Sequence, residues 1–262
     1  MEIVDLSPQY EDSYLVCLED WSDEMEEAGE HKARWYAKMR DRGLRVKLAL
    51  DVEGRPVGMI QYLPIEHSPA LGTDLYMILC VWVHGYKEGV GNEQGHGVGE
   101  ALLAAAEQDV RELGAKGIAA WGTALPFWMR ASWFKKHGYR KAERVGIRTL
   151  VWKRFSADAV APRWIATGEP PQSVPGQVTV SAFVNGWCPA SNVVYERAKR
   201  AAAEFGDEVV FESVDTSEQS TMIGCGQSDC VFVDGKVLQK GPPPSYERIH
   251  KTIAKRVEKL NR

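Results

Sequence analysis

The sequence lacks the features that mark several classes of protein. Its apolar runs are too short to span a bilayer, and its first residues do not show the basic and apolar regions of a secretory signal. A net charge of −4 argues against a nucleic-acid partner, because duplex binding favours a basic face. We therefore expect a cytoplasmic protein that binds neither membranes nor nucleic acid.

Cysteine is scarce and irregularly placed. The five cysteines are Cys17, Cys80, Cys188, Cys225 and Cys230. An odd number at uneven spacing does not indicate a secreted disulfide framework. Each thiol must therefore be interpreted from its own surroundings.

The chain has no internal repeat, and its 262 residues are enough for two domains of different fold. Proline and small residues gather between Ser156 and Gln177, without a helical or strand period. This composition is typical of a linker. We expect domains at residues 1–155 and 177–262, joined by residues 156–176.

The periodicity of the first half predicts a mixed α/β fold, with the order β-α-α-β-β-β-α-β-α-β. The expected strands are residues 3–5, 44–51, 56–64, 75–83, 118–121 and 147–153. Four helices are expected. The first begins at Ser7-Pro8, the second spans 26–42, the third ends near Leu113 and the fourth spans 126–136. In the helix ending near Leu113, the residues Leu103, Ala106, Val110 and Leu113 share one apolar face.

The second half predicts β-α-β, then a hairpin and a last helix. The expected strands are residues 178–184, 209–214, 231–234 and 237–239, and the helices are 190–205 and one from Ser245 onward.

A glycine-rich stretch, NEQGHGVGEALL at residues 92–103, carries the clearest functional signal. Gly95, Gly97 and Gly99 let the main chain turn tightly and approach a ligand closely. The first amides of the helix that follows have no partner within the helix and lie at its positive end. The stretch therefore predicts a phosphate site.

Two common phosphate-binding motifs do not fit this stretch. A dinucleotide fingerprint needs its third glycine one residue later and a strand directly before it. A Walker loop needs Gly-Lys-Ser/Thr, which is absent.

The stretch resembles instead the pyrophosphate loop of the GNAT acetyltransferases, Q/R-x-x-G-x-G/A, at Gln94, Gly97 and Gly99. SWFKKHGY, at residues 132–139, is similar to a later motif of that superfamily. The resemblance covers roughly residues 1–155 and implies the acyl-CoA N-acyltransferase fold, a mixed sheet of the α+β type.

The resemblance implies a site for acetyl-CoA where the strand ending near Val83 parts from the strand ending near Trp121. The main chain of β-strand residues would hold the pantetheine arm, and loop amides would hold the pyrophosphate. A small-molecule or peptide amine would then attack the thioester directly. The expected cofactor-binding residues are Val81, Trp82, Val83, Gln94, Gly95, His96, Gly97, Val98, Gly99 and Glu100.

Two departures from the family pattern concern the chemistry. Many relatives carry a tyrosine that protonates the leaving thiolate, whereas Phe134 stands at the matching position and cannot donate a proton. The loop from Val83 to Gln94 is also longer than usual, so it is expected to cover the cofactor or reach the acceptor.

Amine attack needs a neutral nucleophile, and hence a base or a water chain to one. Glu66 and His67, before the buried strand, and His84, at its end, are the candidates. Residues 11–30 hold nine acidic side chains and no basic one, and in this fold they are expected to attract a cationic acceptor. The alternative is a solvated helical face.

FVNGWCPAS, at residues 183–191, resembles the active-site turn of thioredoxin-like proteins. A thiol at a helix N-terminus has a lowered pKa, so Cys188 is the candidate reactive thiol. Ser191 replaces the second redox cysteine, and Asp229 replaces the expected cis-proline. Cys188 could instead form a disulfide with Cys225 or Cys230, or the three thiols could hold a soft metal.

An acetyltransferase followed by a small thioredoxin-like domain resembles the YoaP-type acetyltransferases. Two alternatives stay open, a binding or sensing protein for a thiol-reactive ligand or soft metal, and a thiol-disulfide enzyme. The acceptor, the acyl chain length and the oligomeric state do not follow from the sequence.

Overall fold

The computed structural model describes residues 1–124, 129–238 and 242–262. The chain forms two compact units. Unit 1 comprises Met1–Trp21 and Lys38–Ile165, and unit 2 comprises Ser22–Ala37 and Ala166–Arg262. The boundary at which the chain leaves unit 1 for the last time lies between Ile165 and Ala166, inside the segment predicted as a linker. Among the helices of the described residues, none has the length and apolar character of a membrane span.

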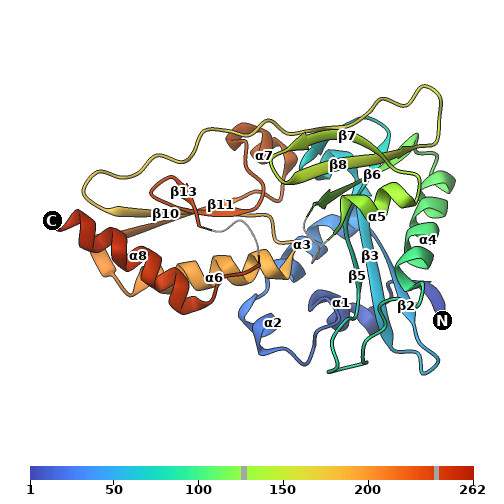
Figure 1. The fold of residues 1–262 in the computed structure, drawn as a ribbon, viewed down its shortest axis with the longest axis horizontal. Coiled ribbons are helices and arrows are strands. Elements are labelled where there is room, and N and C mark those ends of the chain that lie inside the picture. The colour runs from blue at the N-terminus through green and yellow to red at the C-terminus, as the bar shows by residue number, and fades with distance from the viewer. Residues whose placement is uncertain (125–128, 239–241) are drawn as a thin grey trace. The chain divides into compact units, whose positions relative to one another are not determined.

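A seven-stranded sheet forms the centre of unit 1 (Figure 1). Its strands are β1 (Glu2–Asp5), β2 (Arg45–Leu50), β3 (Pro56–Pro64), β5 (Leu75–Val83), β6 (Gly117–Thr123), β7 (Arg140–Val145) and β8 (Arg148–Arg154). The order is β1-β2-β3-β5-β6-β8-β7, in which only the β5–β6 pair is parallel. The predicted mixed sheet is confirmed. The strand β7 was not predicted, and it pairs with β8 through a turn at Gly146, whose φ is +58°.

The helix α4 (Val98–Glu112) packs on this sheet beside β2, β3 and β5 (Figure 1). Three of its predicted apolar positions, Leu103, Ala106 and Val110, are buried in the core cluster. Leu113 is instead the C-cap residue and is 48% exposed, because it lies past the last helical turn.

The single helix predicted over residues 26–42 is wrong. Gly29 has a φ of +62° and separates α2 (Asp23–Glu27) from α3 (His31–Met39), which continues as η2 (Arg40–Arg42). Before them come η1 (Pro8–Tyr10) and α1 (Glu11–Leu15).

A two-stranded sheet forms where no strand was predicted. β9 (Arg163–Trp164) pairs with β4 (Ala70–Leu71), which follows η3 (Ile65–His67). The main-chain N–H of Trp164 donates to Glu143 at 2.6 Å, and the Trp164 side chain is buried. Residues 163–164 are therefore held in a strand, although they lie in a segment whose composition is that of a linker.

The helix α5 (Ala131–Lys136) begins close to β6. A Cβ on Gly122 would lie 2.4 Å from the Ala131 nitrogen, so a side chain there would displace the helix. The main-chain N–H of Thr123 donates to the carbonyl of Met129 at 2.8 Å. The predicted helix start at residue 126 lies outside the described residues.

The C-terminal part of unit 2, residues 166–262, has a four-stranded sheet and, among the described residues, three α-helices; α2 and most of α3 complete the unit. The elements of this C-terminal part are β10 (Val178–Val184), α6 (Pro189–Ala203), η4 (Gly206–Glu208), β11 (Val209–Asp215), α7 (Gln219–Cys225), β12 (Cys230–Val233), β13 (Lys236–Val237) and α8 (Tyr246–Leu260). The strand order is β11-β10-β12-β13, and only β10 and β11 are parallel. The helix α7 was not predicted, and Gln239, the predicted end of the last strand, lies outside the described residues.

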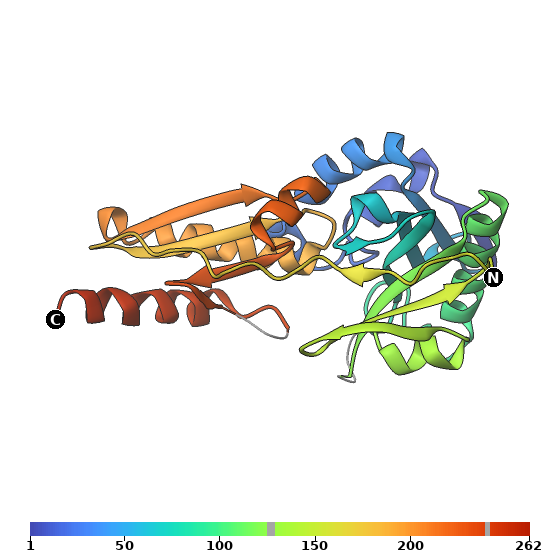
Figure 2. The ribbon, with the colours of Figure 1, turned by 90° about the horizontal axis from the view of Figure 1, so that it is seen from above.

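Two helices of unit 2, α6 and α8, pack together against β10, and Figure 2 shows α8 running alongside the strands. Ile249, Ile253 and Val257 of α8 are buried in the core cluster of this unit. The Oγ of Ser245 accepts from the main-chain N–H of Arg248 at 3.4 Å, so the predicted N-terminus of this helix is confirmed.

Residues 22–37 belong to unit 2 through ion pairs with α6. The carboxylate of Glu27 accepts from Arg197 Nε at 2.9 Å and from Arg200 at 2.8 Å, and Glu24 lies 2.9 Å from Arg197. Hydrogen bonding from Arg197 lowers the pKa of Glu27. These two carboxylates are neutralised within unit 2, so the prediction that the whole acidic run attracts an acceptor is not supported at Glu24 and Glu27.

Candidate active site

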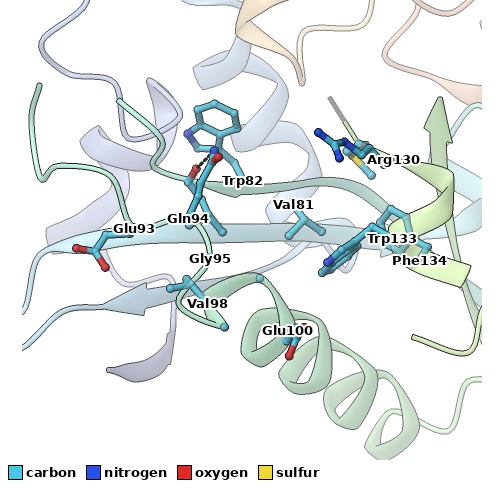
Figure 3. Close-up of a pocket in the computed structure, with 14 residues that line it drawn as sticks. Val81, Trp82, Glu93, Gln94, Gly95, Val98, Glu100, Arg130, Trp133 and Phe134 are labelled. Carbon is cyan, nitrogen blue, oxygen red and sulfur yellow. Dashed lines mark hydrogen bonds between the residues drawn. The ribbon is translucent and has the colours of Figure 1, made fainter. Parts of the chain in front are cut away.

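A cavity of about 440 Å³ opens in unit 1 between β5, the glycine loop, α4 and α5 (Figure 3). Its lining residues are Val81, Trp82, Val83, Glu93, Gln94, Gly95, Gly97, Val98, Gly99, Glu100, Met129, Arg130, Trp133 and Phe134. All of the predicted cofactor-binding residues except His96 are among them. In Figure 3, Trp82 and Arg130 lie on the side of the cavity away from α4, which carries Val98 and Glu100.

The cavity exists because two parallel strands part. β5 pairs with β6 from Leu75↔Gly117 to Ile78↔Ala120 and no further. β5 continues to Val83 along β3, while β6 continues to Thr123 along β8. Beyond Ile78, one edge of β5 therefore lacks the strand partner that it has before, and its main-chain groups can bond to side chains or to a ligand.

A β-bulge at Leu79 decides which side chains face α4. Cys80 pairs with Gln61 and Ile78 pairs with Tyr62, so Leu79 is the extra residue on β5. An extra residue reverses the alternation of the strand. Accordingly Ile78, and then Val81 and Val83, pack with the core cluster that contains the buried residues of α4, which we call the α4 cluster.

The start of α4 keeps the properties expected of a phosphate site. Gly97 is the N-cap residue, with a φ of +79°, and the first bond within the helix runs from the Ala101 N–H to the Gly97 carbonyl at 3.0 Å. Among the described residues, no side chain caps this end. The amides of Val98 and Gly99 are therefore directed outward beside the cavity.

Gln94 acts on the strand through its side chain. Its Nε2 donates to the Val83 carbonyl at 3.2 Å, the bond drawn in Figure 3. A Cβ on Gly85 would lie 2.3 Å from this Nε2, so the glycine makes room for the amide. Gln94 therefore fastens the loop to the end of β5.

The charges around the cavity are of both signs. Arg130 is the one lysine, arginine or histidine among the described lining residues. Glu93 lies 3.4 Å from His96, and Glu100 lies 3.4 Å from His137. Each carboxylate therefore has an imidazole beside it, and the His96 ring faces Glu93 outside the cavity lining.

Phe134 is buried and lines the cavity at the position where the family resemblance has tyrosine. Its ring packs edge to face on Trp133 and Tyr139, with centroid distances of 5.0 and 5.3 Å. Burial raises the pKa of Tyr139 well above its usual value, so that phenol stays protonated.

His84 has both ring nitrogens engaged. Trp21 Nε1 donates to His84 Nε2 at 3.2 Å, and His84 Nδ1 lies 2.6 Å from the Gly91 carbonyl. An Nε2 that accepts requires Nδ1 to carry the proton, so the ring is neutral and donates to Gly91. His84 thus holds the long loop in place, and its geometry does not favour the predicted role of base.

Glu66 and His67 lie away from the cavity. Pro64, just before them, pairs with Tyr76, and Val81 lies five positions after Tyr76 on β5. At a rise of about 3.3 Å per residue, this is about 16 Å along β5. Glu66 and His67 are therefore not among the residues that line the cavity, and their role as the base stays a prediction.

The thiols of unit 2 occupy separate positions. Cys188 is the N-cap residue of α6, as predicted, and is 8% exposed. The thiols of Cys225 and Cys230 donate to the carbonyl and side-chain oxygens of Gln227, at 3.4 and 3.3 Å. All five cysteines lie in the described residues and none forms a disulfide.

No group of three metal-ligating side chains occurs among the described residues. The structure therefore does not bring Cys188, Cys225 and Cys230 together as a soft-metal site. Asp229 Oδ1 accepts from the main-chain N–H of Asn185 at 3.1 Å, and no cis peptide bond occurs in the described part of the chain.

Five lining residues were not predicted to bind the cofactor, Glu93, Met129, Arg130, Trp133 and Phe134. The available signal for the last four was the second motif at residues 132–139, which begins beside them. The motif predicts a helix, but only the close approach at Gly122 places that helix against the cavity.

Comparison with known proteins gives low-identity matches to solved structures. An aminoglycoside 6'-acetyltransferase type Ii is 17% identical, with a TM-score of 0.46, over 59% of this chain and 97% of that one. A Brucella melitensis GNAT acetyltransferase solved with acetyl-CoA is 17% identical, with a TM-score of 0.42, over 62% and 94%. A PaiA N-acetyltransferase from Thermoplasma acidophilum, solved with coenzyme A, is 16% identical, with a TM-score of 0.44, over 59% and 98%.

No curated protein matches the chain. The model of the acetyltransferase (GNAT) family matches residues 6–139, which is just over half of the 262 residues and includes the cavity-lining residues. The chain therefore belongs to the acetyltransferase (GNAT) family.

Proposed function

We propose that this protein is an N-acetyltransferase that transfers an acetyl group to an amine of a small molecule or a peptide. Acetyl-CoA is the acetyl donor that family membership gives it. The observation that carries the proposal is the start of α4, which no described side chain caps and which lies beside the cavity and the unpaired edge of β5.

The loop suits a diphosphate. Gly95 and Gly97 have φ values of +84° and +79°, which glycine adopts without strain, and the loop's main chain is exposed. Each charge-assisted amide contact contributes about 1.5–3 kcal/mol. A few such contacts supply much of the affinity for the nucleotide end of acetyl-CoA.

The unpaired edge of β5 suits an extended arm. Main-chain groups there bond to an extended ligand as they would to another strand. Val81 and Val83 also pack into the α4 cluster, which fixes the strand that presents these groups.

In the proposed reaction the amine nitrogen forms a bond to the acetyl carbon while the carbon–sulfur bond breaks. Coenzyme A leaves as the thiolate, and the amine nitrogen loses one proton. Phe134 cannot supply a proton, and both nitrogens of His84 are engaged. We therefore assign the protonation of the leaving thiolate to solvent.

For unit 2 we propose a thioredoxin-like accessory domain. The order β11-β10-β12-β13, with α6 between the two parallel strands, supports this assignment. The position of Cys188 at the start of α6 supports a reactive thiol there. Alkylation of Cys188 against pH tests it, and a pKa equal to that of an unperturbed thiol would count against it.

Calorimetry with acetyl-CoA, followed by assay of coenzyme A release with a panel of amines, tests the acetyltransferase. We expect micromolar binding and amine-dependent release. Absence of binding by the folded full-length chain would refute the proposal and favour a protein that senses a thiol-reactive ligand through unit 2.

A further inference from the structure

The side chain of Trp121 reaches across the point where β5 and β6 part. Trp121 directly follows Ala120, the last β6 residue that pairs with β5. Its indole Nε1 donates to the Leu79 carbonyl at 2.8 Å. Leu79 is the bulged residue of β5, so this indole supplies the bond that the next β6 residue would have given in a continuous sheet.

A second side chain donates to a main-chain carbonyl on the same edge of β5, at Val83, four residues beyond Leu79. The main-chain N–H of His84 donates to the Val57 carbonyl at 2.9 Å, on the β3 side. In a trans peptide the Val83 carbonyl must then point away from β3, toward the unpaired edge. This is the carbonyl that accepts from Gln94 Nε2.

Val81 lies between these two positions. Residues two apart on a strand present their main-chain groups to the same edge. The N–H and carbonyl of Val81 therefore face the cavity, which Val81 lines. Among the described residues, no side-chain bond to these groups is present, whereas the carbonyls of Leu79 and Val83 both accept from side chains.

We propose that Trp121 is a positioning residue that sets the register of the acetyl thioester along β5. By occupying the Leu79 carbonyl, its indole leaves the Val81 groups as the place where the arm of acetyl-CoA pairs. Without the indole N–H, the Leu79 carbonyl becomes a second acceptor, two residues or about 6.8 Å along the strand. The inference rests on the proposed acetyltransferase function.

Displacement of the thioester should lower kcat more than it weakens the binding of acetyl-CoA. The diphosphate contacts at Gly97 to Gly99 do not involve Trp121, so nucleotide binding is retained. Misplacement of a reacting group by about 1 Å is enough to cost roughly 100-fold in rate. In variants without the indole donor, kcat should therefore fall while the dissociation constant of the cofactor changes little.

The test uses the full-length chain and two changes at Trp121. Trp121→Phe removes the donor and part of the ring. Replacement by 3-benzothienylalanine, which has sulfur in place of N–H, removes the donor and keeps the shape. Trp164→Phe is the matched control, because this tryptophan is buried in the same unit and pairs with β4 outside the cavity lining.

For both Trp121 changes we expect kcat to fall roughly 10- to 100-fold, while the calorimetric Kd for coenzyme A changes less than about 3-fold. The ¹³C shift of bound [1-¹³C]acetyl-CoA, measured without acceptor, should move toward its value in water. The control should retain the kcat and the carbonyl shift of the wild type.

The outcomes are distinct. If the benzothienyl protein has wild-type kcat and a wild-type carbonyl shift, the positioning role is refuted while the acetyltransferase stands. A fall of kcat, cofactor affinity and melting temperature together would reduce Trp121 to a packing residue and also overturn the proposal. If the wild-type chain does not bind acetyl-CoA, the proposed function fails first. Should Trp121→Phe fail to fold, the benzothienyl protein decides.

Discussion

The helices α4 and α6 are of equal length, 15 residues, and begin in opposite ways. α4 starts at Gly97 with a φ of +79° in an exposed loop beside a cavity. α6 starts at Cys188 with a φ of −112°, followed by proline. The buried Asn192, within this helix, donates to the Gly186 carbonyl of the preceding turn at 3.0 Å. Both ends carry the same partial charge.

If α4 binds a diphosphate as proposed and α6 does not, the helix dipole alone does not make an anion site. At α4 the residues before and after the helix start are glycine, so the outward amides are accessible. At α6, Pro189 has no N–H to offer, and Cys188 is 8% exposed. Whether an anion can bind at a helix start then depends on exposed main-chain amides and on small neighbouring side chains.

The largest effect is expected from Gly99→Val, at the second residue of α4. A Cβ there would lie 3.5 Å from the Trp133 ring and 3.7 Å from Val83, so a branched side chain fills the space beside the amides. We expect coenzyme A binding to weaken at least about 100-fold, or about 2.7 kcal/mol, in calorimetry.

Ala190→Val, at the second residue of α6, is the matched control and should leave that affinity unchanged. Unaltered binding by a folded Gly99→Val protein would refute the assignment of the loop.

A smaller effect is expected in unit 2 from Arg197→Ala. The Arg197 side chain is 10% exposed and bonds to Glu27 and to the Pro244 carbonyl, so its loss leaves carboxylates of residues 22–37 without their main partner. We expect about 2 kcal/mol of destabilisation, measured by amide hydrogen exchange in α6.

Arg200→Ala, whose side chain is 54% exposed, should cost less than about 0.5 kcal/mol. Equal losses for the two arginines would show that the contact is not specific.

Acid pH should affect both units through lowered carboxylate pKa values. Burial opposes this shift at Asp109, but hydrogen bonds from Arg45 and Tyr62 lower its pKa overall, and Arg197 lowers that of Glu27. A lowered folded-state pKa contributes stability that is present above the unfolded pKa of about 4 and is lost as pH falls through the folded value.

Asp109→Asn should therefore flatten the acid dependence of hydrogen exchange in unit 1, and Glu27→Gln should do so in unit 2. If Asp109→Asn changed only the exchange of unit 2, the assignment of these carboxylates to their units would be wrong.

The smallest effect is expected from Cys188→Ser. Because the acetyltransferase chemistry is assigned to unit 1, kcat and KM for acetyl-CoA should stay within about twofold of wild type, well under 1 kcal/mol. A tenfold loss of kcat would show that the thiol takes part in the transfer.

Local patterns alone determined much of this protein. The bounds of β3, β5 and β10 agree with the predicted ranges, and the glycine loop and the cysteine N-cap were read directly from adjacent residues. These features depend on turn residues and on the period of neighbouring side chains, which a sequence displays without knowledge of distant contacts.

Tertiary structure decided what the site contains. The parting of β5 from β6 and the bond from Trp121 each involve residues about forty positions apart, and the bulge at Leu79 depends on the pairing of β5 with β3. The Trp21 bond that fixes the His84 tautomer, and the docking of Glu27 on α6, span 63 and 170 positions. Such contacts follow from how separate elements pack, so the sequence predicted the glycine loop that we propose binds the cofactor, whereas only the folded chain selected the side chains around it.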